Sequence, residues 1–269
     1  MKVEVLLATM FYEQENENFL ELMNIQTDIV IGNQCDHIGN EMFTYNGNNV
    51  TVLSRKERGV GRNRNTCLFY SDADVILFAD NDVRYYDGYG EKIEDFYRTH
   101  PNADMVIFNF KEKRDNEPIH DINTHNKKAH LKDITKFGTW AVTAKRESVL
   151  KKRISFSLLF GGGAKYGCGE DSLFLTDCYK SGLNIYLSDD TLGEVVHKES
   201  TWFNGITEKY IFDKGALFRA MCPKMCKVFI FRHILKHKKL YSQFGNIKEL
   251  MQIMYKGAED YKKSFIGEK

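Results

Sequence analysis

The residues best placed to do chemistry are Asp80 and Asp82, a D-x-D pair that directly follows the apolar run 75–78. Such a run is typical of a strand covered on both faces of a parallel sheet, and ligands of open α/β sheets gather where these strands end. Carboxylate oxygens at that edge suit Mg²⁺ or Mn²⁺, and these ions in turn bind diphosphates. The alternative is a solvated acidic turn, because short acidic turns after strands are common.

Two arginines follow glycines at an expected helix start. Gly59 and Gly61 lead into Arg62 and Arg64. Backbone N–H groups at a helix start and guanidinium forks both suit the anionic or carbonyl oxygens of a nucleotide diphosphate. The alternative is that both arginines pair with acidic strand ends and serve only the structure.

Glycines are concentrated in the segment 161–169, which ends at Glu170 and Asp171. Glycine permits backbone conformations that side chains would obstruct, so this segment is suited to approach a sugar closely. Glu170 and Asp171 then open an expected helix. Acidic residues in a first turn can serve as helix caps alone.

The elements that must position these residues follow from the alternation of apolar and helical stretches. In the first half we expect strands at 3–9, 28–33, 50–54, 75–80 and 105–110, and helices near 15–24, 62–70 and 89–99. This alternation predicts a mostly parallel, doubly wound α/β sheet. After a polar connection over 111–136, a second block should contain a strand at 139–144, a helix over 170–181, and strands at 184–187 and 194–197.

The order of these motifs resembles the family 2 glycosyltransferases with the GT-A fold, especially the bacterial enzymes that build capsular polysaccharide, exopolysaccharide and lipopolysaccharide. The resemblance covers roughly residues 3–203 and rests on G-x-x-R-N, D-x-D and G-x-G-E-D in combination. It implies a Rossmann-like catalytic domain over 1–203, with a nucleotide-binding half (1–110) and an acceptor half (111–203). A basic helical extension over 204–269 follows. Two departures stand out, since the first strand ends without a proline turn and Asn81 occupies a position where an acid is frequent.

The resemblance also implies a catalytic role for Asp171. As general base it would take a proton from the acceptor hydroxyl, which attacks the anomeric carbon opposite the leaving nucleotide and inverts its configuration. Asp82 would bind Mn²⁺ or Mg²⁺, and Asp80 would reach the ribose or a metal-bound water. The ion would stabilise the charge that develops on the diphosphate leaving group. His197 would complete the metal site, or else be a hydrogen-bonded structural residue.

The remaining candidates are contacts to the two substrates. Those expected to contact the nucleotide sugar are Thr9, Asp36, Arg62, Arg64, Asp80 and Glu170, and those expected to contact the acceptor are Trp140, Gly163 and Trp202. Asp36 could equally be a plain turn residue, and either tryptophan could belong to the core.

Composition limits the partners and the compartment. The formal charge of +1 argues against a general nucleic-acid binder, which normally carries a strong basic excess. The six cysteines are scattered, as expected for reduced thiols in the cytosol, and Cys222 with Cys226 lacks the second pair of a zinc site. The amino terminus has no signal-peptide pattern, and no apolar run approaches the ~20 residues of a membrane span. We therefore expect a cytoplasmic protein.

Basic residues are concentrated near the carboxyl terminus. Eight lysines and arginines lie between Lys214 and Lys239, and no acidic residue occurs between Asp213 and Glu249. A basic amphipathic helix over 224–240 could lie on an anionic membrane, peripherally at its inner face, beside a polyprenyl-diphosphate-linked acceptor. The alternative is a solvated basic face on a helix packed against the catalytic domain.

Together these patterns predict an inverting, metal-dependent glycosyltransferase. Its donor would be a nucleotide sugar, most simply a UDP-sugar, and its acceptor a saccharide of a growing surface glycan. A sugar nucleotidyltransferase is the first alternative, although the Gly-rich basic signature it should carry near the first strand is absent. A non-catalytic sugar-binding protein is the second.

Overall fold

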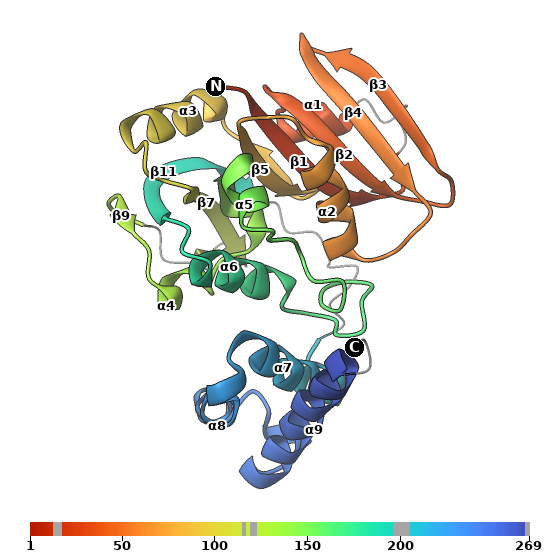
Figure 1. Cartoon of the computed structure of the whole chain (residues 1–269), viewed down its shortest axis with the longest axis vertical. Helices are drawn as coiled ribbons and strands as arrows, with labels where there is room; N and C mark the ends of the chain where they lie inside the picture. Colours follow the sequence, from red (N-terminus) through yellow and green to blue (C-terminus); the bar gives the residue numbers. More distant parts are fainter. Residues whose placement is uncertain (13–17, 115–116, 119–122, 196–204, 267–269) are drawn as a thin grey trace.

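The fold is built on one long, mostly parallel sheet (Figure 1). A computed structural model describes residues 1–12, 18–114, 117–118, 123–195 and 205–266. The strand order is β3-β4-β2-β1-β5-β10-β7-β11-β6. Bounds of these strands are β1 (Val3–Met10), β2 (Asp28–Gln34), β3 (Gly39–Tyr45), β4 (Asn48–Arg55), β5 (Val75–Asp80), β6 (Val83–Tyr85), β7 (Met105–Arg114), β10 (Val142–Lys145) and β11 (Ile185–Val195). Two short strands, β8 (Glu117–Pro118) and β9 (Lys127–Lys128), pair with β7 and β11.

Parallel pairing brings several strand ends to one edge of the sheet. Strands β4, β2, β1 and β5 run parallel to one another, with Ala8 opposite Asp80 and Thr9 opposite Asn33. Strand β10 runs antiparallel between β5 and β7. Because residues 75–79 are almost completely buried, the apolar run before Asp80 is indeed a strand covered on both faces.

Helices flank this sheet on both sides (Figure 1). They are α1 (Asn18–Met23), α2 (Val60–Tyr70), α3 (Tyr89–Thr99), α4 (Leu131–Ile134), α5 (Arg146–Lys151) and α6 (Glu170–Lys180). In the view of Figure 1, α2 lies in front of the strands and α1 behind them. Helix α2 packs on β1 and β2, and there the side chain of Asn63 lies against Gly32. The architecture confirms the predicted α/β class and the mostly parallel sheet.

The carboxyl-terminal part forms three further helices, α7 (Glu208–Met221), α8 (Cys226–Lys236) and α9 (Ile247–Ile266), below the sheet in Figure 1. They enclose a small core of their own around Ile211, Ile230, Ile234 and Met254. A second cluster joins α7 to the segment before α6, with Phe160 and Tyr166 packed near Ala216 and Leu217. No helix in the described ranges is both long and apolar enough to span a bilayer.

Several element boundaries differ from the prediction. Residues 139–141 form a 3₁₀ turn, η1 (Thr139–Ala141), and only 142–145 form strand β10. One strand, β11, replaces the two short ones expected after 184, because bulges between Leu187 and Gly193 keep it paired with β7. Residues 196–197 of the second expected strand lie outside the described ranges. The connection over 111–136 is also not wholly irregular, since it contains the end of β7, β9 and α4.

Candidate active site

A buried arginine connects the three acidic residues singled out by the motifs. The Arg64 side chain is 3% exposed, and its Nη2 donates to Asp80 Oδ1 at 2.8 Å. Its Nη1 donates to Asp171 Oδ1 at 2.7 Å and lies 3.5 Å from Glu170 Oε1. Since Arg64 is on α2, Asp80 ends β5 and the other two open α6, one guanidinium fixes three separate elements relative to one another.

The charge of Arg64 is maintained by its neighbours. Burial opposes a charged guanidinium, but Asp80, Asp171 and Glu170 outweigh it and raise the pKa of Arg64. Its guanidinium carbon lies 5.4 Å from the centre of the Phe156 ring, which stacks on Phe174 at 4.0 Å. The arginine is therefore held between carboxylates and an aromatic wall. Each terminal nitrogen of Arg64 thus donates to a carboxylate of the protein itself, which is the kind of pairing that the structural alternative describes.

Glu170 occupies the most confined position of the three acids. Burial, followed by the negative charge of Asp171, raises the pKa of Glu170 to about 7, although Arg64 works in the opposite direction. Gly161 lies directly against its carboxyl group: a Cβ there would come 2.9 Å from Glu170 Cδ, and the φ of 102° also favours glycine. The Gly-rich segment is thus needed for space beside Glu170.

Asp171 is held on one oxygen. Thr139 Oγ1 donates to Asp171 Oδ1 at 2.8 Å, and Arg64 Nη1 donates to the same atom. The side chain of Asp171 is 26% exposed. Oδ1 accepts both of these hydrogen bonds, which fix the orientation of the carboxylate. Oδ2 takes part in neither of the two.

The loop that leads into Asp171 is attached to its surroundings through backbone groups. Val60 N–H donates to Gly162 O at 3.0 Å, which joins the start of α2 to the Gly-rich segment. Gly167 N–H donates to Asp213 Oδ2 of α7 at 2.9 Å, and Asp213 is almost completely buried. The segment 161–169 is therefore fixed from both sides, by the sheet domain and by α7.

A model of the family described as glycosyl transferase family 2 matches residues 24–154, which include the Arg64 and Asp80 motifs. This match spans just under half of the chain, and the enzyme that it indicates is a glycosyltransferase. No curated protein sequence matches it.

The fold of this glycosyltransferase is also that of solved structures. The crystal structure of S. aureus TarS 1-349 in complex with UDP-GlcNAc has a TM-score of 0.64 at 14% identity, covering 98% of this chain and 92% of that chain. The same TarS fragment in complex with UDP has a TM-score of 0.62 at 15% identity, with the same coverage. Another TarS structure, at 14% identity and a TM-score of 0.62, is covered to 55% of its length. The likeness establishes the GT-A fold.

The other residues expected near the nucleotide are spread along the carboxyl edge of the sheet. Thr9 is buried in β1, whereas Asp36 is exposed just after β2. Arg62 is half exposed and forms an ion pair with Glu57 at 3.1 Å. Asp82 is half-buried in the turn between β5 and β6. Asp80 and Glu170, also expected at the nucleotide, form ion pairs with Arg64.

The residues expected at the acceptor have mixed positions. Trp140 is half-buried and packs its ring edge to face with Phe110 at 5.3 Å, which matches the core alternative. Gly163 is exposed in the Gly-rich turn with a φ of 79°. His197 and Trp202 lie outside the described residues.

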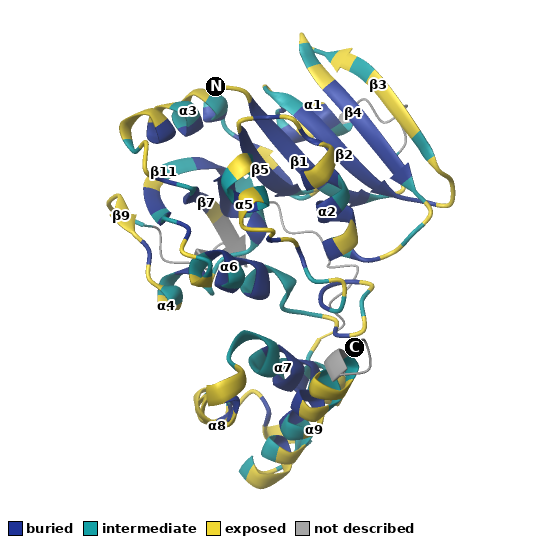
Figure 2. Cartoon of the chain, viewed as in Figure 1, coloured by how far each residue is buried: buried dark blue, intermediate teal, exposed yellow. Residues whose placement is uncertain are grey.

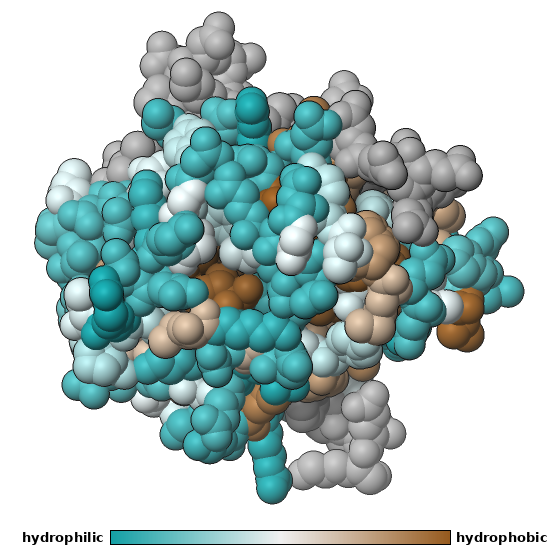
Figure 3. All heavy atoms as spheres, turned by 90° about the horizontal axis from the view of Figure 1, so that it is seen from above, coloured by the Kyte–Doolittle hydropathy of each residue, from teal (hydrophilic) through white to brown (hydrophobic). Residues whose placement is uncertain are grey.

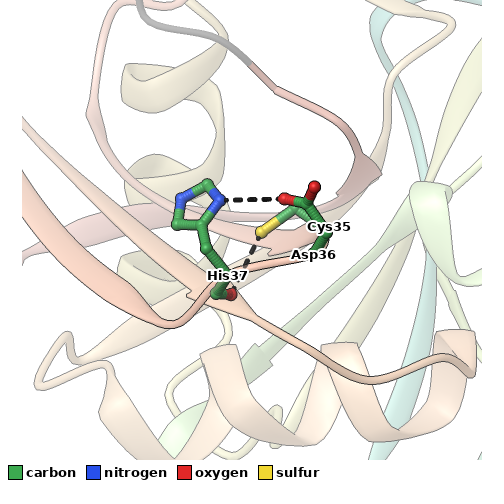
Figure 4. Close-up of side chains that lie close together, drawn as sticks. All are labelled: Cys35, Asp36 and His37. Carbon is green, nitrogen blue, oxygen red and sulfur yellow. Dashed lines mark hydrogen bonds and ion pairs between the residues drawn. The ribbon is translucent and has the colours of Figure 1, made fainter.

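A group of metal-binding side chain types lies at the end of β2 (Figure 4). Cys35, Asp36 and His37 each offer one ligand atom, and these three atoms lie within 4.8 Å of one another. Among the described residues, no other group of three or more His, Cys, Asp or Glu side chains is gathered so closely. His37 Nδ1 is 3.3 Å from Asp36 Oδ1, and Cys35 Sγ donates to His37 O. A thiolate and an imidazole suit Zn²⁺ better than the hard ions that bind diphosphates.

Two residues of the site escaped sequence reasoning. Thr139 fell inside an expected strand, and Phe156 in a stretch without any motif. A threonine and a phenylalanine are not recognisable as site residues by type alone. Their roles depend on Asp171, 32 positions from Thr139, and on Arg64, 92 positions from Phe156. Asp213 was noted only as the last acid before the basic segment.

Proposed function

We propose that this glycosyltransferase moves one sugar, with inversion, from a UDP-sugar to a growing surface polysaccharide or lipid-linked glycan. The observation that carries the proposal is the Arg64 cluster, because it holds the strand end of the D-x-D motif and the candidate base at fixed positions around one cation. Reaction partners must be held in such a geometry for an in-line displacement to occur. The nucleotide is taken as UDP because the TarS structures of the same fold contain UDP and UDP-GlcNAc.

In this mechanism Asp171 is the general base. Arg64 and Thr139 hold Oδ1, so Oδ2 is the oxygen that accepts the proton of the acceptor hydroxyl. That hydroxyl oxygen forms the new bond to the anomeric carbon as the bond to the diphosphate breaks. Arg64 is a positioning residue here, in place of the nucleotide contact expected from its motif, since its terminal nitrogens bind Asp80 and Asp171.

The donor side of the proposal includes Mn²⁺ or Mg²⁺. The residues fit such an ion, because Asp80 and Asp82 offer hard carboxylate oxygens at the carboxyl end of a buried strand, where diphosphates bind in open α/β sheets. Asp82 would hold the ion and Asp80 would support it through water or contact the ribose, with His197 as a further candidate. When bound, the ion would stabilise the charge of the departing diphosphate.

Paired variants test both halves of this proposal. Asp171→Asn keeps the shape of the side chain but removes the proton acceptor, so turnover should fall by roughly 10²–10⁴ while UDP affinity stays close to that of the wild type. Asp82→Ala should instead lose the Mn²⁺-dependent part of UDP affinity in calorimetry. Asp177→Asn on α6 and Asp95→Ala on α3 are matched controls that should change neither quantity.

Three results would argue against these roles. Loss of stability and donor affinity in Asp171→Asn, with turnover per bound donor preserved, would make Asp171 a helix cap and Glu170 the next candidate base. Equal UDP affinity of Asp82→Ala and wild type, or equally tight binding in a chelator, would refute the metal assignment. Release of diphosphate from a nucleoside triphosphate with a sugar phosphate would favour the nucleotidyltransferase alternative.

The acceptor is proposed to be a saccharide, free or carried on a polyprenyl diphosphate. A lipid-carried acceptor stays in the bilayer, so the enzyme would work peripherally at the inner face of the cell membrane. The support for this part is the basic carboxyl-terminal region, whose helices lie next to the Gly-rich segment.

A further inference from the structure

Helix α8 has apolar residues on two opposite faces. On one face, Cys226, Ile230 and Ile234 recur every four residues and are buried against α7 and α9. On the other, Val228, Phe231 and Leu235 are 49%, 43% and 48% exposed. Because the first face alone accounts for the packing of α8, the second is not required by the fold of the chain.

The exposed apolar side chains extend beyond the helix. Met225 before it and Leu240 after it are 53% and 51% exposed, and Phe229 is 38% exposed. Figure 2 shows α8 as one of the most exposed helices of the molecule. The end of the molecule seen in Figure 3 is mostly hydrophilic, with small apolar patches. Exposed apolar side chains are therefore concentrated on and beside α8.

The sequence on and beside α8 is rich in cations and contains no acid. Lys227, Arg232 and Lys236 belong to α8, and all three are exposed or half-buried. Lys224, Lys238 and Lys239 flank it, and the sequence contains no Asp or Glu between Asp213 and Glu249. The charges of α8 and its flanks would therefore attract a negatively charged partner.

We propose that the outer face of α8 docks on an anionic lipid bilayer, with Val228, Phe231 and Leu235 inserted at the boundary between headgroups and acyl chains. An interfacial helix places its apolar residues at the edge of the acyl chains and its basic residues at the level of the headgroups. A bilayer with anionic headgroups offers an apolar layer to the first and negative charge to the second. A nucleic acid would match the charge but leave the apolar side chains in water. This inference concerns a surface separate from the Arg64 cluster, and donor chemistry does not enter it.

The test is co-sedimentation of the full chain with vesicles of phosphatidylcholine alone and of phosphatidylcholine mixed with phosphatidylglycerol. Wild-type protein should bind the anionic vesicles and not the neutral ones, and binding should weaken as salt rises. The triple variant Lys227→Gln, Arg232→Gln, Lys236→Gln should bind about 10²-fold more weakly, since each cation near the surface contributes roughly fivefold. The triple variant Val228→Ser, Phe231→Ser, Leu235→Ser should also lose binding, although its charge is unchanged.

Control variants use residues elsewhere that are at least as exposed as the apolar residues of α8. Ile38→Ser with Met42→Ser, near β3, removes exposed apolar side chains, and Arg98→Gln with Lys151→Gln removes exposed cations. Neither pair should change vesicle binding. UDP affinity measured without vesicles should be the same in the α8 variants and the wild type, which separates this inference from the proposed transfer reaction.

Three outcomes would overturn the proposal: equal binding to neutral and anionic vesicles, unchanged binding of the Val228, Phe231 and Leu235 variant, or a wild-type dimer that this variant converts to a monomer. The last result would make a second copy of the chain the occupant of the face.

Discussion

Arg64 is the residue on which the geometry of the candidate active site depends. Asp80, Glu170 and Asp171 would repel one another if they were gathered without a cation, and burial would increase that repulsion. A buried ion pair adds little net stability, because desolvation offsets the attraction, but it does specify which groups meet. In this glycosyltransferase the ion pairs specify that α2 meets the end of β5 and the start of α6. The same bonds direct both terminal nitrogens of Arg64 to carboxylates of the protein itself.

The elevated pKa of Glu170 predicts a pH dependence of folding stability. With a pKa of about 7 when folded and an ordinary value of 4.5, Glu170 binds more protons in the folded state between those two pH values. Its contribution to the free energy of unfolding is therefore complete below pH 4.5 and is lost as the pH rises through 7. The Glu170→Gln variant should lack this decline, which we expect to be on the order of 1–3 kcal/mol.

Urea unfolding of both proteins at several pH values measures the difference. Glu57→Gln, which removes a carboxylate from the exposed pair with Arg62, is the control and should retain the wild-type profile. Parallel profiles for Glu170→Gln and wild type would mean that Glu170 is ionised in the folded protein across this range.

The residues that meet at the site were largely identifiable from the sequence, but their partners were not. The motifs marked Asp80, Glu170, Asp171 and Arg64, because acids after strands and arginines after glycines are unusual enough to notice. The motif alone could not decide between a diphosphate and a carboxylate as the partner of Arg64, since both present the same oxygens to a guanidinium. Thr139 carried no such mark, and its contact with Asp171 arises only when η1 packs beside α6.

At the scale of elements, local patterns predicted the buried strands and the amphipathic helices well. Helix α3 begins and ends where the sequence places it, at Tyr89 and Thr99. Strand β3 was missed although Asn46 and Gly47, both with positive φ, form the tight turn that joins it to β4. An Asn-Gly pair between two strands is a strong hairpin signal. β3 is an exposed edge strand without a continuous apolar run, so the apolar pattern used for the other strands does not detect it.

The crossing of α7 and α9 depends on two glycines that bring the helix backbones into contact. A Cβ on Gly215 would lie 1.9 Å from Met254 O, and one on Gly257 would lie 1.9 Å from Phe212 O. Gly215→Ala should therefore push the helices apart and lower the free energy of unfolding by about 1–3 kcal/mol, as overpacked cores do. Urea unfolding checks this value. Gly39→Ala is the control, because its Cβ would meet only one atom, at an ordinary 3.8 Å; equal effects of the two substitutions would contradict the close crossing.

At the scale of the whole molecule, the helical region and the sheet domain are connected through the Gly-rich segment that precedes α6. Ala216 and Leu217 of α7 complete an apolar cluster with Phe160, Tyr166 and Leu173, which lie before and within α6. Asp213 of the same helix accepts the Gly167 N–H, two residues before α6 begins. The sequence predicted a boundary near residue 203, but composition alone could not indicate that the part after it supports the loop that precedes Asp171.

This connection predicts that residues 1–203 do not make a complete catalytic unit. Without α7, the side chains of Phe160 and Tyr166, which are fully buried in the whole chain, would face water, and Gly167 would lose its partner. The chain 1–203 should therefore show no cooperative thermal transition and no transferase activity.

Asp213→Ala in the full chain removes the Gly167 bond while keeping the helices, so it should fold cooperatively but turn over more slowly at unchanged UDP affinity. Lys209→Ala, which removes the other partner of Asp213 and leaves the Gly167 bond, would show whether any loss is specific to that bond. If the chain 1–203 unfolds cooperatively and binds UDP as the full chain does, the helices are an independent appendage and the loop is held by the sheet domain alone.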